Sequence, residues 1–144
     1  MIIVKQDPEQ RYAGALPLWR ERLVWVAAPG LVTAFAEARE GRALPLVLSP
    51  APCVYRARAT RTLERAGVRW RGVFASPSFA GQAAAVRAGL GYAVMPRAMV
   101  PQELAVLSDW PELAEVEIAL LGQSRLSPAT AALAGFIQAK VARR

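Results

Sequence analysis

The stretch that most constrains the fold of this chain is residues 75–97, where a loop, a helix, a glycine stop and a short strand follow one another. Ser76 and Ser78 are both of a residue type that caps a helix N-terminus, and Pro77 suits a first-turn position. The free backbone N–H groups and positive dipole end of such a helix suit a small anionic or polar ligand. Any strand–helix–strand unit needs the same loop merely to fold, so both interpretations stay open at this point.

The helix and strand after this loop are predicted from spacing. Apolar residues recur on one helical face at Phe79, Ala83, Val86 and Leu90. Gly89 and Gly91 supply the permissive backbone that ends a helix. Residues 92–95 form an apolar run of strand length, which Pro96 ends.

The remaining elements follow the same alternation of strand and helix. Short apolar runs predict strands at 2–4, 23–28, 44–48, 70–75, 104–107 and 116–121. Helices are predicted at 31–39, at 54–66 and from Ser127-Pro128 onward, the last with an apolar face of Ala129, Leu133, Phe136, Ile137 and Val141. This alternation favours an α/β fold with largely parallel pairing.

Two lobes are predicted from this order of elements. Residues 28–95 form one β-α-β-α-β lobe, and residues 1–27 and 96–144 form the other. Ligands of such sheets bind beyond the carboxyl ends of the strands. Here those ends are Ser49-Pro50 and residues 76–78, each followed by a predicted helix start.

The formal net charge is +7, and its distribution is uneven. Residues 51–100 carry eight arginines against the single acidic residue Glu64. Such a segment suits nucleic acid, an anionic ligand or an acidic partner, or is simply a solvated face. The carboxylates at Glu112, Glu115 and Glu117 are interpreted as a solvated rim.

Catalytic chemistry has little support in the residue types present. There is no histidine, so the commonest general base and metal ligand are missing, and one cysteine cannot build a zinc or iron–sulfur site. We therefore expect no enzyme activity, no cofactor and no bound metal. Cys53 begins a predicted helix near Arg56 and is either a reactive thiol or a small buried hydrophobe.

The sequence also favours a cytoplasmic location. No apolar run approaches the roughly 20 residues that span a bilayer. The first residues lack the basic and long apolar regions of a signal peptide. A single cysteine cannot form an internal disulfide, which fits a reducing compartment.

Residues 86–96, Val-Arg-Ala-Gly-Leu-Gly-Tyr-Ala-Val-Met-Pro, resemble the glycine–proline signature in the effector-binding domain of LysR-type transcriptional regulators. The resemblance extends over the segments at 23–30, 45–66, 74–81, 116–121 and the Ser127-Pro128 helix. It implies the type II periplasmic-binding-protein fold, with two α/β lobes joined by two crossover strands. It also implies that the first lobe is incomplete on its N-terminal side and exposes apolar surface that invites self-association.

The resemblance implies an effector-sensing domain that binds a small polar or anionic ligand in a cleft between the lobes. The implied effector-binding residues are Ser49, Pro50, Cys53, Arg56, Ser76, Pro77, Ser78 and Phe79. The implied hinge residues are Trp25, Ala28, Met95, Pro96 and Arg97. The expected partners are a small-molecule effector and further copies of the chain, with no membrane, and DNA only through a winged helix-turn-helix absent from this sequence.

Two further functions stay open beside this one. The fold is shared with transport receptors, so a solute-binding module outside transcription is one alternative. A basic nucleic-acid-binding domain built on the cluster from Arg56 to Arg71 is the other.

Overall fold

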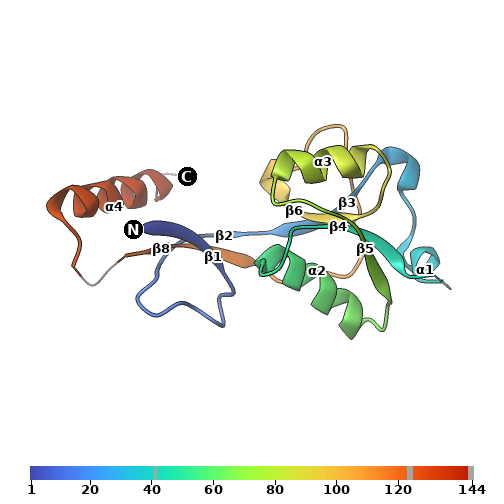
Figure 1. Ribbon diagram of the computed structural model, residues 1–144, viewed down its shortest axis with the longest axis horizontal. Helices are drawn as coiled ribbons and strands as arrows, with labels where there is room; N and C mark the ends of the chain where they lie inside the picture. Colours follow the sequence, from blue (N-terminus) through green and yellow to red (C-terminus); the bar gives the residue numbers. More distant parts are fainter. Residues whose placement is uncertain (41, 123–124, 143–144) are drawn as a thin grey trace. The chain divides into compact units, whose positions relative to one another are not determined.

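The structure is a computed structural model that describes residues 1–40, 42–122 and 125–142 (Figure 1). The chain divides into two compact units. Unit 1 combines residues 1–21 with residues from 115 onward, and unit 2 is the continuous segment 22–114. The observed divisions therefore fall after residues 21 and 114, whereas the predicted ones fall after residues 27 and 95.

The sheet of unit 2 explains this difference. Its strands are β3 (Leu23–Ala27), β4 (Leu44–Leu48), β5 (Trp70–Ala75), β6 (Ala93–Pro96) and β7 (Ala105–Val106). β3 pairs antiparallel with both β6 and β7, so the strand before residue 27 and the segment after residue 96 belong to one sheet. β4 pairs parallel with β5, and a parallel bridge between Leu46 and Tyr92 links β4 to the chain entering β6. The expectation of largely parallel pairing is thus wrong, because both neighbours of β3 run antiparallel to it.

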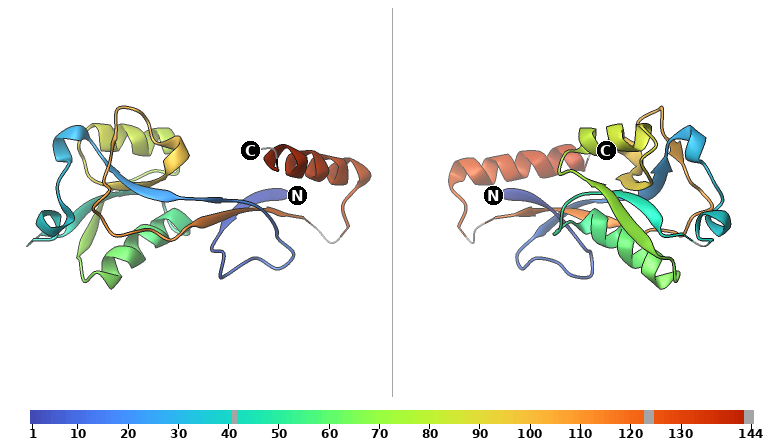
Figure 2. Two further views of the ribbon diagram at one scale, coloured as in Figure 1. Left: turned by 180° about the vertical axis from the view of Figure 1, so that it is seen from behind. Right: turned by 45° about the vertical axis from the view of Figure 1, so that its right-hand side comes forward.

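The helices of unit 2 are α1 (Phe35–Ala38), α2 (Val54–Arg65) and α3 (Phe79–Arg87), with 3₁₀ turns at Pro29–Leu31 and Arg97–Met99. α2 and α3 cover opposite faces of the sheet, as the views of Figures 1 and 2 agree. Strands 44–48 and 70–75 are confirmed, and the helix predicted at 54–66 ends one residue early.

The helix predicted at 31–39 is wrong, since only one turn of α-helix forms there. The Leu31 carbonyl oxygen accepts from the Tyr92 hydroxyl at 3.3 Å, and the Thr33 carbonyl oxygen accepts from the Trp110 indole N–H at 3.1 Å. These two carbonyls are thereby used for tertiary contacts, whereas a helix would direct them to its own N–H groups. Periodicity alone does not reveal such competition.

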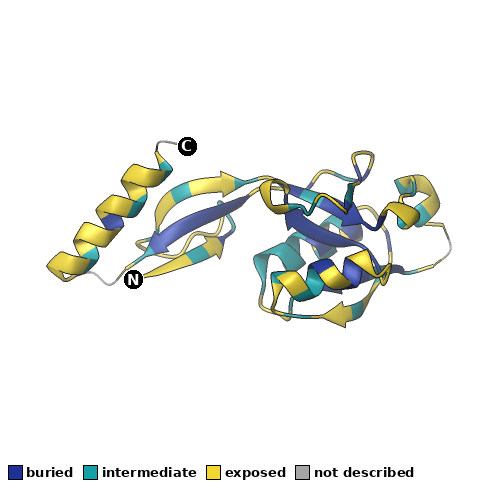
Figure 3. Cartoon of the chain, turned by 90° about the horizontal axis from the view of Figure 1, so that it is seen from above, coloured by how far each residue is buried: buried dark blue, intermediate teal, exposed yellow. Residues whose placement is uncertain are grey.

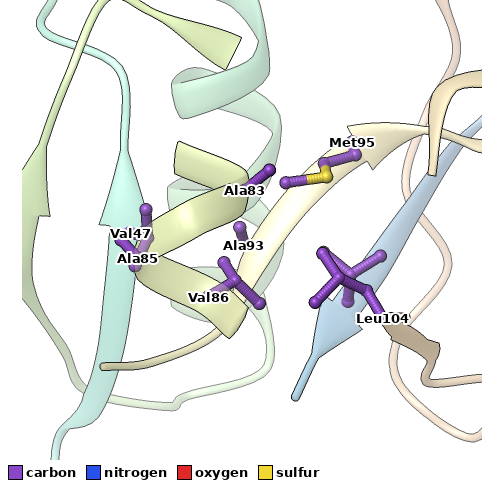
Figure 4. Packing of buried hydrophobic residues seen from close by; sticks show 8 residues of the cluster. Val47, Ala83, Ala85, Val86, Ala93, Met95 and Leu104 are labelled. Carbon is purple, nitrogen blue, oxygen red and sulfur yellow. The ribbon is translucent and has the colours of Figure 1, made fainter. Parts of the chain in front are cut away.

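Part of the core of unit 2 lies between the sheet and α3 (Figure 4). Its buried cluster consists of Val26, Val47, Ala83, Ala85, Val86, Ala93, Met95 and Leu104. The predicted inner face of α3 is confirmed at Ala83 and Val86, but Leu90 is 48% exposed. Gly89 has a φ of +79°, so the chain turns away from the core immediately before Leu90.

The proposed hinge residues all lie inside unit 2. Trp25, Ala28, Met95 and Pro96 are buried, and the Arg97 N–H donates to the carbonyl of Arg22 at 2.9 Å. The chain passes between the units at residues 21–22 and 114–115 instead. A hinge role for these five residues stays a prediction.

Unit 1 consists of β1 (Ile2–Gln6), β2 (Leu16–Glu21), β8 (Val116–Leu121) and α4 (Pro128–Val141). β8 pairs antiparallel with β1 on one side and β2 on the other. Figure 3 shows β8 buried between two largely exposed neighbours. β2 is not predicted from the sequence, because Pro17 and a register shift between Pro17 and Trp19 hide the alternation of a regular strand.

The apolar face predicted for α4 is partly wrong, since Ile137 and Val141 are half-buried but Leu133 and Phe136 are exposed. Its cap is confirmed, with the Ser127 hydroxyl accepting from the Thr130 N–H. Ala134 is the buried residue of the helix, whereas Leu133 is 50% exposed and Phe136 is 60% exposed. Alanines lie on most faces of α4, so the spacing of its apolar residues does not determine which face packs against the sheet.

Glu117 is buried, so its interpretation as part of a solvated rim is wrong. Its side chain is 2% exposed and accepts from Gln6 Nε2 at 3.0 Å and from Arg11 Nη2 at 2.7 Å. Arg20 Nε lies 3.7 Å from the same carboxylate. The hydrogen bond from Arg11 holds the pKa of Glu117 below its ordinary value, against an opposing effect of burial.

Candidate functional site

The carboxyl ends of β4 and β5 bring two predicted loops together in unit 2. Because the two strands are parallel neighbours, the residues that follow them emerge at the same edge of the sheet. Ser49 follows β4 and Ser76 follows β5, and the Ser76 N–H donates to the Leu48 carbonyl at 3.0 Å. α2 and α3 begin a few residues further on, at Val54 and Phe79.

The start of α3 is held by serine hydroxyls. Ser78 is the N-cap, with its Oγ accepting from the Gly81 N–H at 3.2 Å. Ser76 Oγ accepts from the Ser78 N–H at the same distance of 3.2 Å. Capping by Ser78 is therefore confirmed, whereas Pro77 precedes the cap and does not occupy the predicted first-turn position.

Gln82 joins the two loops, and sequence reasoning missed it. Its Nε2 lies 2.7 Å from Ser49 Oγ and 2.8 Å from the Ser76 carbonyl oxygen. A usable signal is present in the sequence, since Gln82 is the one amide side chain among the small and apolar residues of the first two turns of α3.

The other proposed site residues are placed differently. Arg56 braces the first loop from α2, donating to the Ser49 carbonyl at 3.0 Å, and its guanidinium lies 5.9 Å from the centre of the Trp70 ring. Phe79 is half-buried and packs against the core cluster. Cys53 is a half-buried residue at the N-cap of α2 whose side chain makes no capping bond, and Pro50 is exposed. The structure thus brings Ser49, Ser76 and Ser78 together, and Arg56 contacts the backbone of Ser49 from α2.

The hydroxyls of this edge form a set of hydrogen-bond donors. Each oxygen of Ser49, Ser76 and Ser78 already accepts an N–H hydrogen. Among the residues that the structure describes, none of the three hydroxyl hydrogens has an assigned acceptor. A hydroxyl that accepts one bond can still donate its own hydrogen, so this edge offers donors to a ligand that carries acceptor oxygens.

The charge around this edge also favours an anion. Between Glu40 and Glu103 the only acidic residue is Glu64. Its carboxylate accepts from the Trp70 indole N–H at 3.4 Å. Trp70 begins β5, whereas Ser76 follows the opposite end of that strand. Two helix N-termini add positive dipole ends at the same edge, which strengthens the preference for negative charge.

A separate hollow lies in unit 1, between β2 and α4. It has a volume of about 440 Å³ and is lined by Pro17, Leu18, Trp19, Gln138, Val141 and Ala142. Its polar side-chain groups are the Gln138 amide and the Trp19 indole N–H, and it has no charged side chain. In the described parts of the chain, no group of acidic, histidine or cysteine side chains is arranged to hold a metal ion.

The sequence matches the family model described as "LysR substrate binding domain" over residues 1–142. The chain belongs to the LysR substrate-binding domain family. A curated relative is the HTH-type transcriptional regulator DgdR of Burkholderia cepacia, which is 40% identical over 124 residues. That alignment covers 83% of this chain and 40% of the relative, so the chain spans about two fifths of the length of DgdR.

Solved LysR regulatory domains share the fold. The bromide-bound regulatory domain of HypT from Salmonella typhimurium has a TM-score of 0.78 at 20% identity, covering 99% of this chain and 72% of that one. The CcmR regulatory domain of Synechocystis PCC6803 in complex with 2-PG has a TM-score of 0.71 at 18% identity, covering 96% and 72%. The effector-binding domain of QuiR in complex with shikimate has a TM-score of 0.67 at 16% identity, covering 90% and 66%. The expected fold class is confirmed.

No helix in the described parts of this LysR-family chain has the length and apolarity needed to cross a membrane.

Proposed function

We propose that this chain is the effector-sensing domain of a LysR-type transcriptional regulator and binds a small anionic or polar molecule at the carboxyl ends of β4 and β5. The observation that carries the proposal is the meeting of three serine hydroxyls at one edge of the sheet of unit 2. Family membership over residues 1–142 gives this edge a ligand-binding context. The ligand acts through binding energy alone, without a catalytic step or cofactor.

An anion is the ligand type that the edge suits best. Three hydroxyl hydrogens and two helix N-termini stabilise acceptor oxygens, and Glu64 is the only acidic residue in the sequence between Glu40 and Glu103. Related regulatory domains have been solved with bromide, 2-PG and shikimate. These three compounds are therefore reasonable starting probes for this chain.

Replacing the serines tests the site. We expect Ser76→Ala and Ser78→Ala each to weaken binding of an anionic probe about tenfold, since each removes a hydrogen bond to a charged group. Isothermal titration with shikimate and 2-PG measures the affinities. Ser108→Ala, an exposed serine elsewhere in unit 2, serves as the control and should bind like the wild type. Unchanged affinity in both site variants would remove the site from consideration.

We also infer that the chain works in the cytoplasm as a homo-oligomer and meets DNA through a winged helix-turn-helix outside this sequence. Exposed Ile2, Ile3, Leu133 and Phe136 in unit 1 support self-association, because water-exposed apolar side chains favour burial against another chain. Light scattering after gel filtration should give a mass above the 15.5 kDa of one chain. A monomer at all concentrations up to about 100 μM would contradict the oligomer, because weaker association is negligible at working concentrations.

A further inference from the structure

Gln82 occupies a special place at the serine edge. It lies one turn into α3, half-buried, and its side chain reaches both strand ends rather than solvent. The residues around it in the helix are alanine, glycine, valine and phenylalanine, which carry no side-chain donor or acceptor. Gln82 is therefore the polar group through which α3 acts on the two loops.

The orientation of its amide group follows from chemistry. The Ser76 carbonyl oxygen can only accept a hydrogen bond, so the amide atom 2.8 Å away from it must be the nitrogen. That nitrogen carries two hydrogens, and its second contact is Ser49 Oγ at 2.7 Å. Both hydrogens are thus used, and Ser49 is fixed as an acceptor toward Gln82.

This arrangement decides what Ser49 offers to a ligand. Because its oxygen accepts from Gln82, its own hydrogen is left to donate elsewhere. Ser49 is also held at its backbone, where the carbonyl accepts from Arg56 of α2 at 3.0 Å. The residue is therefore braced from helices on both faces of the sheet, which keeps its donor in place before a ligand arrives.

Resting on the proposed function, we infer that Gln82 is a positioning residue that sets the charge preference of the site, by keeping the Ser49 hydroxyl as a donor for a carboxylate or similar acceptor. Gln82 need not touch the ligand for this role. Loss of the Gln82 amide should therefore change which ligand is favoured, and not only how tightly a ligand binds.

Gln82→Glu is the sharpest test because it keeps the size of the side chain and reverses its chemistry. An ionised Glu cannot donate to the Ser76 carbonyl, draws the Ser49 hydrogen toward itself and adds a negative charge. Gln82→Met removes the bonds without adding charge and serves as the matched control for packing. Sodium benzoate and benzamide are the matched probes, being of similar shape and differing in charge.

Each probe is titrated into the full chain at pH 7 and followed in ¹H–¹⁵N spectra, which can measure dissociation constants in the millimolar range. We expect Gln82→Glu to weaken benzoate binding about tenfold to a hundredfold while changing benzamide binding by less than about threefold. A purely structural role would weaken both probes equally.

Side-chain amide exchange provides a readout that needs no ligand. Both Gln82 amide hydrogens should exchange slowly with water in the wild type, and Ser49→Ala should release one of them. Fast exchange of both hydrogens, or equal loss of benzoate and benzamide in Gln82→Glu, overturns the role of Gln82. A failure of both probes to shift the backbone N–H signals of Ser49, Ser76 and Ser78 in the wild type instead overturns the proposed function, and with it the charge preference, whatever the exchange data show.

Discussion

Gly91→Ala should destabilise unit 2 by about 3 kcal/mol, because the new methyl group has no space. A Cβ at this position would lie 2.5 Å from the Pro45 carbonyl oxygen and 2.9 Å from its carbon, both backbone atoms of β4. The clash falls where the Tyr92 N–H donates to the Pro45 carbonyl and the Val47 N–H donates to the Tyr92 carbonyl. Relief would require separating β4 from the chain that enters β6. Urea unfolding followed by tryptophan fluorescence measures the change.

Gly30→Ala is the matched control for this change. Gly30 also lies in unit 2, has no positive φ and would place its Cβ in open space. We expect its effect to stay within about 0.5 kcal/mol. Equal stability of Gly91→Ala and the wild type would show that the close approach of these two segments is not needed for the sheet.

Glu117→Gln should destabilise unit 1 by about 2 kcal/mol at pH 7, because the neutral amide that replaces the buried carboxylate cannot form the charge-assisted hydrogen bond with Arg11. The value is set below that of a fully buried ion pair because the Arg11 side chain is 45% exposed and can regain water. Thermal or urea unfolding followed by circular dichroism measures the difference. Glu115→Gln, at a carboxylate 45% exposed and 3.9 Å from Arg20, is the control and should change stability by less than about 0.5 kcal/mol.

The effect of Glu117 should depend on pH in a defined direction. Its pKa is lower in the folded chain than the ordinary value of 4.5, so the carboxylate stabilises the fold fully above that value. As the pH falls below 4.5 through the lowered pKa of the folded state, the stabilisation is lost. The gap between wild type and Glu117→Gln should therefore narrow on acidification. A gap that stays constant down to pH 3 would contradict the ion pair as its source.

The parts of the fold that were predicted correctly are those with strong local signals. Strands 44–48, 70–75 and 116–121 are short, mainly apolar segments, and their bounds match the structure. Ser78 and Ser127 are caps whose chemistry acts within three residues. Such features depend on the neighbouring sequence and need no knowledge of the fold.

The parts that were missed depend on distant partners. β2 was missed because Pro17 and a register shift obscure its alternation of apolar and polar residues. Its strand conformation depends on antiparallel pairing with β8. Glu117 appeared exposed because the residues that bury it, Gln6 and Arg11, lie more than a hundred positions away in the sequence. The predicted lobe boundaries differ for the same reason, as β3 takes its partners from after residue 92.

The candidate site divides in the same way. Ser49 and Ser76 could be placed together because parallel strands end at a common edge. Gln82 could not, because a glutamine in a helix more often faces solvent, and only the contact distances show that it spans both loops. Arg56 was expected near the site. Only the structure shows that its guanidinium donates to the backbone carbonyl of Ser49.

The pairing of β1 with β8 has a consequence for the order in which the chain folds. Ile2 lies opposite Leu121, so β1 cannot pair with β8 until residue 121 has been synthesised. Unit 2 is continuous in sequence and contains all its own strand partners, so its contacts are available earlier. Bringing the two ends together carries the largest loop-closure entropy in the molecule, which slows folding. Until then, the apolar side chains of β1 remain unpaired, and exposed apolar side chains of this kind favour aggregation.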